Sequence, residues 1–495
     1  MFRRKKNEIV DLVIDGVNVH GVINLKKEVR NYFANRFSQD YVPMFDFDVD
    51  SHAKISLEQS RFLEAIPSRE EVKNAVWACD TNKAPGFDGF NFKFIREMWD
   101  VLQDEIYEFV INFFDSGDSA RSINVTWVSL IPKIKNPRSI EDFRPISMVG
   151  ALYKIISKLL SFRLREVIAP LIDESQCAFV LDRQILDGVL IANESLNWLK
   201  KRKIPGALLK LDFQKAYDSM NWSFLKMVMV KMGFGRKWIT WILNCVCTSS
   251  MSILLNGSPL KPFRLEKGFR QGDPLSPYLF ILVSEALVHI LKKAEELNLI
   301  EAVKIGKNKV KVKHLQFADD MLIFVPRKDE VVTNYFRILD VFAIMSGLNL
   351  NYSKSSIVTW NSDVHEWARR TVDLNGCIHK KCPISYLGIP IGDNMNRKSA
   401  WKPVVLKIQS KLASWKAKTL SRAGKLTLIK SVINSLPIYF MSMFKMPKSI
   451  ALQIVKLQRR FFWGDSGGNN ISTPSVNWSV IELPKELGVW VWEIL

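Results

Sequence analysis

Residues 206–213 read Gly-Ala-Leu-Leu-Lys-Leu-Asp-Phe, and residues 314–325 read His-Leu-Gln-Phe-Ala-Asp-Asp-Met-Leu-Ile-Phe-Val. The first stretch is typical of a buried β-strand that ends in a carboxylate, Asp212. The second predicts two strands joined at Asp319-Asp320, where two like charges repel each other and need compensation. If the strand and the hairpin are neighbours in one sheet, three carboxylates meet at one end of it.

Such a carboxylate cluster indicates a site for divalent metal ions. Carboxylate oxygens are hard ligands, and a pair of ions leaves room for the phosphates of a substrate. Two metals held about 4 Å apart can activate an attacking 3′-hydroxyl and stabilise a leaving pyrophosphate. For a lone Asp-Asp pair a solvated turn is the ordinary interpretation, and the neighbouring segments weaken it here.

Residues 268–277, Gly-Phe-Arg-Gln-Gly-Asp-Pro-Leu-Ser-Pro, form a dense run of turn residues. We expect a long helix to follow, with Ser276 as its N-cap and Pro277 at its first position. Backbone N–H groups and the Arg270 guanidinium then suit an anionic or base-paired ligand. A simple capped turn is the alternative, but it does not explain why Arg, Gln and Asp lie together here.

The rest of the chain shows alternating helical and strand patterns without a fixed repeat. We expect residues 1 to about 80 to be helical, further helices at 92–115 and 152–167, a short strand at 125–131, and a helix that ends at Gly233. From about residue 400 the chain is predicted to be helical, and its lysines are interleaved with tryptophans.

Composition sets the broad class of the protein. The 495 residues are 47% hydrophobic and 24% charged, which excludes wholesale disorder and suggests roughly three domains. The net charge of +20 points to a polyanionic partner such as nucleic acid. Six cysteines in so long a chain indicate reduced thiols in an intracellular protein. The spacing Cys377, His379, Cys382 is half of a zinc pattern, and ordinary packing is the better interpretation.

The N-terminus has basic residues but no apolar segment of a signal peptide. The run Arg3–Lys6 is a weak nuclear address. The longest apolar run, Tyr278 to Val283, is too short to span a bilayer, so we expect no membrane partner.

The ordered motifs resemble the reverse transcriptases of non-LTR retrotransposons of the long interspersed element type, in the form common in plant genomes. The resemblance extends from about residue 24 to about residue 488. The matching segments are Lys83–Gly89, Leu130–Lys133, Phe143–Ile146, Leu211–Asp218, Gly268–Pro277, Phe317–Asp320, Gly347–Asn351 with Lys354, and Tyr386–Pro390.

This resemblance implies an α+β right-hand polymerase fold, with fingers, a palm built on an antiparallel sheet, and a helical thumb. The implied parts are an N-terminal helical extension (1–80), fingers (81–204) and a palm with interleaved fingers segments (205–375). Residues 376–495 would supply the primer grip, the thumb and a truncated C-terminal connection. The implied activity is RNA-directed DNA polymerisation, with an RNA template, a DNA primer and dNTPs as partners.

The same resemblance assigns roles at the catalytic centre. Asp212 and Asp319 would be the main ligands of two Mg²⁺ ions, with Mn²⁺ as an alternative, and Asp320 a weaker ligand or a structural partner. Lys354 would protonate the leaving pyrophosphate, and a solvated lysine is the alternative. Tyr217, five positions after Asp212, would exclude a ribose 2′-OH, and a core tyrosine is the alternative.

Further residues are implied to bind nucleotide or nucleic acid. The dNTP-binding set comprises Lys133, Arg144, Phe213, Tyr217, Arg270, Gln271 and Gly272. The primer grip would be Tyr386, Leu387 and Gly388, and the thumb residues on the duplex backbone would include Lys411, Trp415 and Lys418. The family's need to reach chromosomal DNA implies a nuclear location.

Some features depart from the family pattern. Asp182 stands where a glycine is usual, and no endonuclease, ribonuclease H carboxylate set or zinc knuckle is recognisable. The competing hypotheses are an inactive nucleic-acid-binding remnant of such an element, an intron-type maturase that mainly binds RNA, and an RNA polymerase on RNA templates. Tyr217 argues against the last, because that enzyme needs a polar group there to accept the 2′-hydroxyl.

Overall fold

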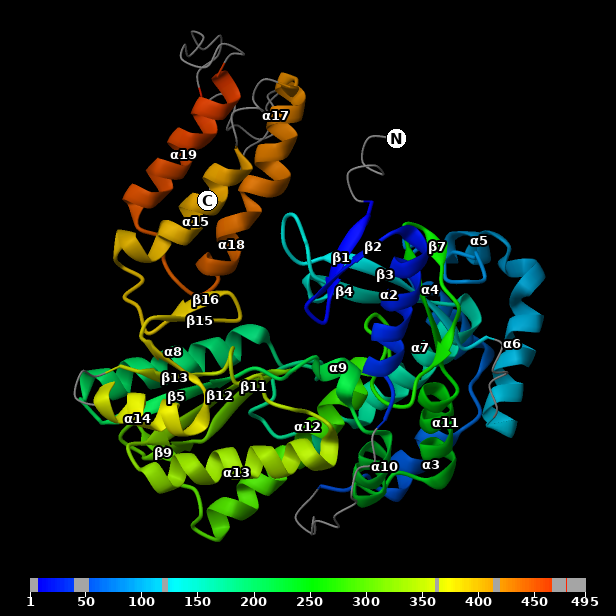
Figure 1. The fold of residues 1–495 in the computed structure, drawn as a ribbon, viewed down its shortest axis with the longest axis horizontal. Coiled ribbons are helices and arrows are strands. Elements are labelled where there is room, and N and C mark those ends of the chain that lie inside the picture. Colours follow the sequence, from blue (N-terminus) through cyan, green and yellow to red (C-terminus); the bar gives the residue numbers. More distant parts are fainter. Residues whose placement is uncertain are drawn as a thin grey trace. The chain divides into compact units, whose positions relative to one another are not determined.

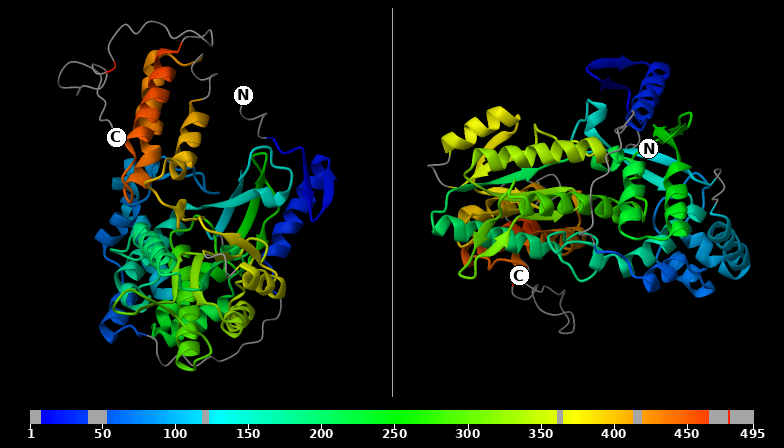
Figure 2. Two further views of the ribbon diagram at one scale, coloured as in Figure 1. Left: turned by 90° about the vertical axis from the view of Figure 1, so that its left-hand side faces the viewer. Right: turned by 90° about the horizontal axis from the view of Figure 1, so that it is seen from below.

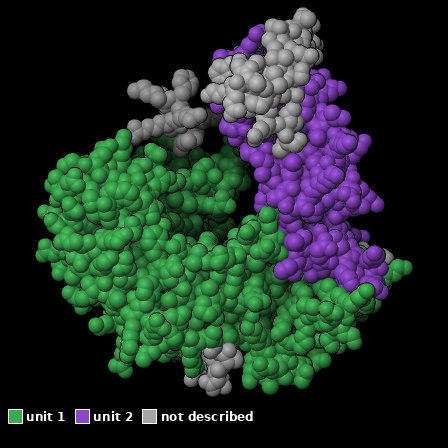
Figure 3. Space-filling view, turned by 180° about the vertical axis from the view of Figure 1, so that it is seen from behind, with its two compact units in different colours: residues 1–188, 203–380 green, residues 189–202, 381–495 purple. Residues whose placement is uncertain are grey.

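The computed structural model describes residues 8–39, 53–117, 123–360, 365–412, 419–464 and 478. The chain divides into two compact units, which Figure 3 shows in different colours. Unit 1 comprises residues 1–188 and 203–380, and unit 2 comprises residues 189–202 and 381–495. Each unit has its own hydrophobic core. The boundaries predicted for the N-terminal extension, fingers, palm and thumb stay predictions.

A five-stranded sheet lies at the centre of unit 1, in the order β11-β12-β5-β13-β14 (Figure 1). The strands are β5 (Gly206–Leu211), β11 (His314–Phe317), β12 (Asp320–Pro326), β13 (Ser356–Thr359) and β14 (Ile378–Lys381). β12 pairs antiparallel with both β11 and β5, and β13 pairs antiparallel with β5. The predicted strand and hairpin are therefore neighbours in one antiparallel sheet, so Asp212 and the Asp-Asp pair come to the same sheet end.

Buried apolar side chains explain why β5 lies inside the sheet. Ala207, Leu208 and Leu209 are fully buried, and so are Leu322 and Ile323 of β12. Helices cover the neighbouring strands, since α13 packs against β12, α14 packs against β13, and the two helices contact each other. These helices are α13 (Asp329–Ser346) and α14 (His365–Asn375).

His314 of β11 makes the stability of this sheet depend on pH. Its Nε2 lies 2.7 Å from Ser175 Oγ, and burial lowers its pKa from 6.5 to about 4. The neutral ring therefore stabilises the fold above pH 6.5, and this contribution is lost as the pH falls from 6.5 towards 4. It amounts to about 3 kcal/mol. Urea unfolding between pH 7 and pH 4 should show this loss in the wild type, and a His314→Gln variant should lack it.

A second sheet in unit 1 has the strand order β4-β3-β6-β7, with β8 also paired to β6. Its strands are β3 (Val125–Pro132), β4 (Phe143–Val149), β6 (Ser250–Leu255), β7 (Ser258–Pro259) and β8 (Phe263–Arg264). β3 pairs antiparallel with β4 and parallel with β6. The β3–β4 pairing sets Ile131 opposite Arg144. Lys133, just after β3, and Arg144 of β4 therefore lie at the same end of this strand pair.

Helices surround the two sheets of unit 1 (Figures 1 and 2). They are α2 (Val22–Arg36), α3 (Leu57–Glu64), α4 (Arg69–Trp77), α5 (Phe92–Glu97), α6 (Trp99–Ser116), α7 (Ala151–Val167), α9 (Ala216–Ser219), α10 (Trp222–Lys231), α11 (Arg236–Cys247) and α12 (Ser276–Glu296), with short 3₁₀ turns η1 (Ile140–Asp142) and η2 (Ala169–Leu171). Ser56 and Ser68 form capping boxes that begin α3 and α4. α8 (Ile185–Lys201) crosses from unit 1 into unit 2.

Two local expectations were wrong. The N-terminal region is not wholly helical, because β1 (Asp11–Ile14) and β2 (Val17–His20) form an antiparallel hairpin. Asp15 and Gly16 both have positive φ in its turn, which is the favoured Asp-Gly hairpin chemistry. Ser276 is not the N-cap of α12 but its first residue, and Leu275 precedes the helix without a side-chain cap. A further hairpin pairs β9 (Val303–Ile305) with β10 (Val310–Val312).

Unit 2 is helical around a small hairpin. β15 (Ile384–Tyr386) and β16 (Ile389–Ile391) pair antiparallel. The helices are η4 (Lys398–Trp401), α15 (Lys402–Lys411), α17 (Arg422–Leu428), a π-helical turn η5 (Ile429–Ile433), α18 (Ser435–Met441) and α19 (Lys448–Trp463). Trp401, Ile408, Ile429 and Ile454 are among the buried residues of their common core. The predicted helical character after residue 400 is confirmed for the described residues.

All six cysteines are free, as predicted from their number. Cys377 is buried, and His379 Nε2 lies 2.9 Å from Thr359 Oγ1 rather than in a metal cluster. Within the described ranges, no helix combines the length and the apolar character needed to cross a bilayer.

Candidate active site

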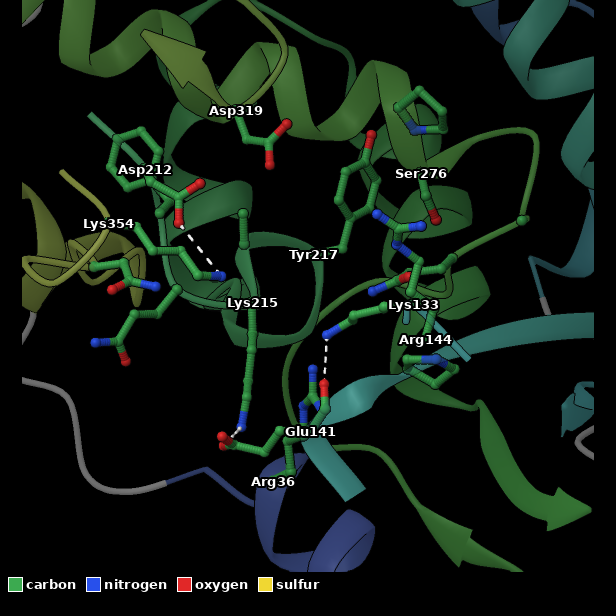
Figure 4. Close-up of a pocket in the computed structure, with 18 of the residues that line it drawn as sticks. Arg36, Lys133, Glu141, Arg144, Asp212, Lys215, Tyr217, Ser276, Asp319 and Lys354 are labelled. Atoms are coloured by element: carbon green, nitrogen blue, oxygen red, sulfur yellow. Dashed lines mark hydrogen bonds and ion pairs between the residues drawn. The ribbon is translucent and has the colours of Figure 1, made fainter. Parts of the chain in front are cut away.

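A cavity of about 770 Å³ opens at the end of the central sheet of unit 1. It is lined by Arg36, Lys133, Glu141, Arg144, Pro145, Asp212, Phe213, Gln214, Lys215, Ala216, Tyr217, Gln271, Gly272, Ser276, Pro277, Asp319, Asn351, Ser353 and Lys354. Figure 4 shows Asp212, Asp319 and Lys354 on one side of it and the basic residues Lys133 and Arg144 on the other. The cavity therefore has an acidic and a basic wall.

The acidic wall consists of Asp212 and Asp319. Asp212 directly follows β5, and Asp319 lies with Ala318 in the turn between β11 and β12. Burial and the negative charge of Asp212 both raise the pKa of the Asp319 carboxyl. The two carboxylates thus repel each other, as expected of ligands that await a cation.

Asp320 differs from its neighbour because it begins β12 and does not line the cavity. It pairs with Phe317, and burial, Asp319 and Asp212 raise the pKa of its carboxyl while Lys210 lowers it. Asp319 belongs to the turn and Asp320 to the strand, and of the two only Asp319 lines the cavity. The predicted group of three is therefore a pair on the cavity wall, and Asp320 fits the structural role that we kept open.

The acidic pair fits a magnesium ion. Across the described residues, no group of three or more His, Cys, Asp or Glu side chains is arranged to hold a metal ion. Mg²⁺, however, is usually bound by one or two carboxylates and completes its octahedral shell with water and substrate phosphates. Asp212 and Asp319, with a cavity in front of them, offer such a donor set.

Main-chain hydrogen bonds fix the loop that carries Asp212. The Asp212 N–H donates to Ser355 Oγ (3.1 Å), and its carbonyl accepts from the Asn351 N–H (2.7 Å). Two residues later the Gln214 N–H donates to the Asn349 carbonyl (2.8 Å). The predicted motif at 347–354 therefore acts as the support of the Asp212 loop.

Two glycines allow close packing behind this loop. A Cβ on Gly268 would lie 2.4 Å from the Asp218 carbonyl oxygen, and a Cβ on Gly347 would lie 2.1 Å from the Ser219 carbonyl oxygen. Both glycines also have positive φ. Any side chain at either position would push the 216–219 turn away. Glycine at 268 and 347 therefore allows these two motifs to pack directly against the segment that follows Asp212.

Tyr217 and Phe213 form the floor of the cavity beside the carboxylates. The Tyr217 ring stacks on Phe280 with centroids 5.2 Å apart and an interplanar angle of 11°. Burial, and then the charge of Asp319, raise the pKa of its hydroxyl, so the group stays neutral. The Tyr217 ring thus packs against Phe280 and also lines the cavity. This position is compatible both with exclusion of a ribose 2′-OH and with a core tyrosine.

The basic wall comes from β3, β4 and the turn after β5. Lys133 donates from Nζ to the Glu141 carbonyl (2.7 Å), and Arg144 is exposed on β4. Lys215, at a positive φ, donates to Tyr32 Oη (3.0 Å) and lies 3.4 Å from a Glu141 carboxylate oxygen. Burial and then the charges of Arg36, Lys354, Arg144 and Lys215 lower the pKa of Lys133. A wall of cations that repel one another favours a polyanionic ligand.

Gln271 and Gly272 line the cavity, but Arg270 does not. Arg270 is 3% exposed; it forms an ion pair with Asp273 at 2.8 Å and donates to the Cys245 carbonyl (3.1 Å). Its guanidinium also lies 4.0 Å from the centroid of the Tyr153 ring. The nucleotide contact predicted for Arg270 is therefore corrected to a structural role in the core.

Lys354 reaches the acidic wall from outside. Its side chain is 70% exposed, and Nζ lies 4.0 Å from Asp212 Oδ2. This long ion pair is exposed to solvent and is compatible with either role predicted for Lys354. Both the proton donor and the solvated lysine therefore stay predictions.

The residues predicted for primer and duplex belong to unit 2. Tyr386, Leu387 and Gly388 form the β15–β16 hairpin, whose turn residues Leu387 and Gly388 have positive φ. Tyr439 of α18 donates from its hydroxyl to the Leu387 carbonyl at 2.9 Å, which attaches the hairpin to the helices. Lys411 is exposed at the end of α15. Trp415 and Lys418 lie outside the described residues. The primer-grip and thumb roles stay predictions.

Sequence reasoning missed several cavity residues. Lys215 belonged to a motif already singled out, so its cationic side chain was a visible signal. Arg36 lies in α2, 182 positions from its partner Asp218, and no local pattern marks it. Glu141, Asn351 and Ser353 line the cavity through the same tertiary proximity.

Comparison with protein families matches residues 131–391 to the family described as reverse transcriptase (RNA-dependent DNA polymerase). This match covers more than half of the chain. The chain belongs to this reverse transcriptase family. Family membership, together with the antiparallel sheet and the helices around it, confirms the predicted α+β right-hand polymerase fold.

Similar sequences come from mobile elements of animals. The Transposon TX1 uncharacterized 149 kDa protein of Xenopus laevis is 26% identical over 467 residues, covering 91% of this chain and 34% of that protein. The Pol polyprotein of the type-1 retrotransposable element R2 of Popillia japonica is 24% identical over 390 residues, covering 73% and 50%. The RNA-directed DNA polymerase from mobile element jockey of Drosophila funebris is 22% identical, covering 74% and 40%. These relatives confirm the relation to non-LTR retrotransposon reverse transcriptases, of whose full length the chain spans a half or less.

Among solved structures, telomerases of Candida albicans and Candida tropicalis, each in complex with a fragment of telomeric RNA, resemble this chain at a TM-score of 0.37. The Candida albicans enzyme is 14% identical, and the alignment covers 77% of this chain and 65% of that one. A likeness at this level carries no argument about function.

Proposed function

We propose that the protein is an RNA-directed DNA polymerase that adds dNTPs to a primer 3′-OH on an RNA template. The main support for this proposal is that Asp212 and Asp319 lie together on one wall of a cavity whose other wall is basic. Phosphoryl transfer needs little covalent help from a protein, because positioning and charge compensation supply most of the catalysis. In this cavity the acidic wall would position the reacting groups through bound metal ions, and the basic wall would compensate the charge of the phosphates.

In this proposal Asp212 and Asp319 hold two Mg²⁺ ions, for which Mn²⁺ is an alternative. When bound, the metal would lower the pKa of the 3′-hydroxyl and offset charge on the leaving pyrophosphate. Lys133 and Arg144 bind the triphosphate through charge-assisted hydrogen bonds. Lys354, whose Nζ lies 4.0 Å from Asp212 Oδ2, would give a proton to the leaving group in this proposal.

The proposed partners are an RNA template, a DNA primer and dNTPs. The +20 net charge supports binding to phosphate backbones, with an affinity that falls as salt rises. A nuclear location and the plant form of the element are proposals as well. For the plant form we note only that a segment of 75 residues, 15% of this chain, is 40% identical to an uncharacterised mitochondrial protein of Arabidopsis thaliana.

Primer extension by the purified chain tests the function. With an RNA template, a DNA primer, dNTPs and Mg²⁺, extension is expected, and it should be absent with rNTPs. Salt-sensitive template binding without any extension would contradict the proposal and favour the inactive remnant. Retained RNA binding with no DNA synthesis on any primer, joined to an effect on intron splicing, would favour the maturase-like alternative.

Tyr217 provides a specific prediction on sugar selection. Its ring lines the cavity and stacks on Phe280, and in this proposal it fills the space that a ribose 2′-hydroxyl would need. Tyr217→Ala should therefore raise ribonucleotide incorporation relative to deoxynucleotide incorporation by about a hundredfold. The measurement is the ratio of kcat/KM values for dCTP and CTP opposite the same template base.

The matched control is Tyr217→Phe, which keeps the ring and removes only the hydroxyl. It should discriminate between the two sugars as the wild type does. An unchanged ratio in Tyr217→Ala would leave Tyr217 as a core residue stacked on Phe280.

A further inference from the structure

Arg36 reaches the cavity from outside the family motifs. It occupies the last turn of α2, its side chain is 12% exposed, and it lines the same cavity as Lys133 and Arg144 (Figure 4). Neither this residue nor its helix belongs to the segments that match the family motifs.

Packing fixes the end of α2 at this place. Phe33 and Phe37 are each 1% exposed, and the Phe37 ring lies 6.5 Å from that of Phe263 on β8. The Glu266 N–H donates to the Phe37 carbonyl (3.0 Å), and Arg30 Nε donates to the Lys261 carbonyl (3.1 Å). The backbone of Arg36 is therefore anchored to the second sheet.

Asp218 holds the side chain of Arg36 and that of a second cavity residue. This carboxylate is 1% exposed. Its Oδ2 accepts a hydrogen bond from Arg36 Nη2, and its Oδ1 accepts one from Gln271 Nε2 at 3.2 Å. The turn that carries Asp218 is itself held against Gly268, where no side chain fits. One buried carboxylate thus joins two segments that both line the cavity.

The charges around Arg36 indicate which kind of ligand this part of the cavity would bind. Lys133, Arg144 and Lys215 line the same cavity, and, besides burial, the charge of Arg36 lowers the pKa of Lys133, so these cations repel one another while Asp218 supplies an opposite charge to Arg36. The Arg36 Nε is itself buried without a hydrogen-bond partner among the described residues, but a guanidinium carries five N–H donors, more than its bond from Nη2 to Asp218 uses. A ligand that meets this wall must supply negatively charged oxygens.

We infer that Arg36 contacts the triphosphate of the incoming nucleotide and that Asp218 is a positioning residue that holds Arg36 and Gln271 at the cavity wall. The inference rests on the proposed polymerase function and deepens it by adding α2 to the nucleotide site. Asp218 itself does not line the cavity, so it acts only through the two residues that it binds.

Steady-state incorporation of a single nucleotide tests the inference with Arg36→Gln and Asp218→Asn. Each variant should raise the KM for dNTP about tenfold or more, with a smaller change in kcat and unchanged affinity for primer–template. Lys27→Gln is the matched control, because it removes one positive charge from an exposed position of the same helix. It should leave the KM unchanged.

The double variant separates positioning from general structural damage. If Asp218 acts through Arg36, the double variant should raise the KM by much less than the product of the two single effects. Independent multiplication of the effects, or lower kcat and melting temperature at an unchanged KM, would overturn the inference. Should Asp218→Asn fail to fold, Arg36→Gln alone decides, since a normal KM in that variant excludes the contact.

A binding measurement keeps this result apart from that of the polymerase proposal. Inorganic tripolyphosphate with Mg²⁺ should raise the melting temperature of the wild type and of Lys27→Gln, and less so that of Arg36→Gln. If the wild type extends no primer but shows this difference, the contact of Arg36 with a triphosphate is supported while the polymerase proposal fails. Equal stabilisation of Arg36→Gln and the wild type would overturn the inference whatever the polymerase activity.

Discussion

Replacing Asp319 by Asn should lower dNTP incorporation by about a thousandfold or more. The substitution keeps the size of the side chain and removes the charge that would hold a metal ion on the acidic wall. Binding of template should change little, because it depends on Lys and Arg contacts to phosphate rather than on this carboxylate. Primer extension and filter binding at two salt concentrations measure the two quantities side by side.

Two other Asp→Asn variants make this test sharp. Asp104 is exposed on α6 and lies outside the cavity lining, so Asp104→Asn should extend primers as the wild type does. Asp320 neighbours Asp319 but begins β12 without lining the cavity, so Asp320→Asn should lose less activity than Asp319→Asn. Wild-type activity in Asp319→Asn would refute the metal assignment. Equal losses at 319 and 320 would show that both carboxylates serve the metals.

The second large effect is expected on stability, at Asp273. This carboxylate is 4% exposed and accepts hydrogen bonds from the Tyr153 hydroxyl (2.6 Å) and the Leu275 N–H (3.1 Å), besides its ion pair with Arg270. Asp273→Ala would leave the buried Arg270 guanidinium without its counter-charge. We expect the free energy of unfolding to fall by about 3–5 kcal/mol. Urea unfolding followed by the fluorescence of the tryptophans measures it.

Removing both charges should restore much of that loss. A double variant, Arg270→Met with Asp273→Leu, leaves no unpaired buried charge and should be more stable than Asp273→Ala. The exposed pair Lys93–Glu97, at 3.9 Å, provides the surface control, and Glu97→Gln should change stability by less than about 1 kcal/mol. If Asp273→Ala unfolds at the wild-type midpoint, the pair does not stabilise the core.

Local patterns predicted the parts of the fold that depend on neighbours in sequence. The apolar run before Asp212 predicted β5, and the stretch at residues 314–325 predicted β11 and β12. The same reasoning missed the β1–β2 hairpin, although Asp15-Gly16 carries the turn signal, because the helical spacing that begins nearby dominated the interpretation. The N-cap of α12 was predicted at Ser276 but lies one residue earlier, at Leu275. The position of a cap depends on backbone angles, which the sequence does not display.

The sequence by itself determined the family, the strands of the central sheet and a group of three carboxylates that would meet at one sheet end if those strands were neighbours. It did so because motif order and side-chain periodicity are properties of the chain as written. Only the tertiary structure decided that Arg270 is buried on Asp273 and that Asp320 leaves the cavity wall. It alone also brought Arg36 to Asp218, because burial and long-range ion pairs arise when segments 182 positions apart pack together.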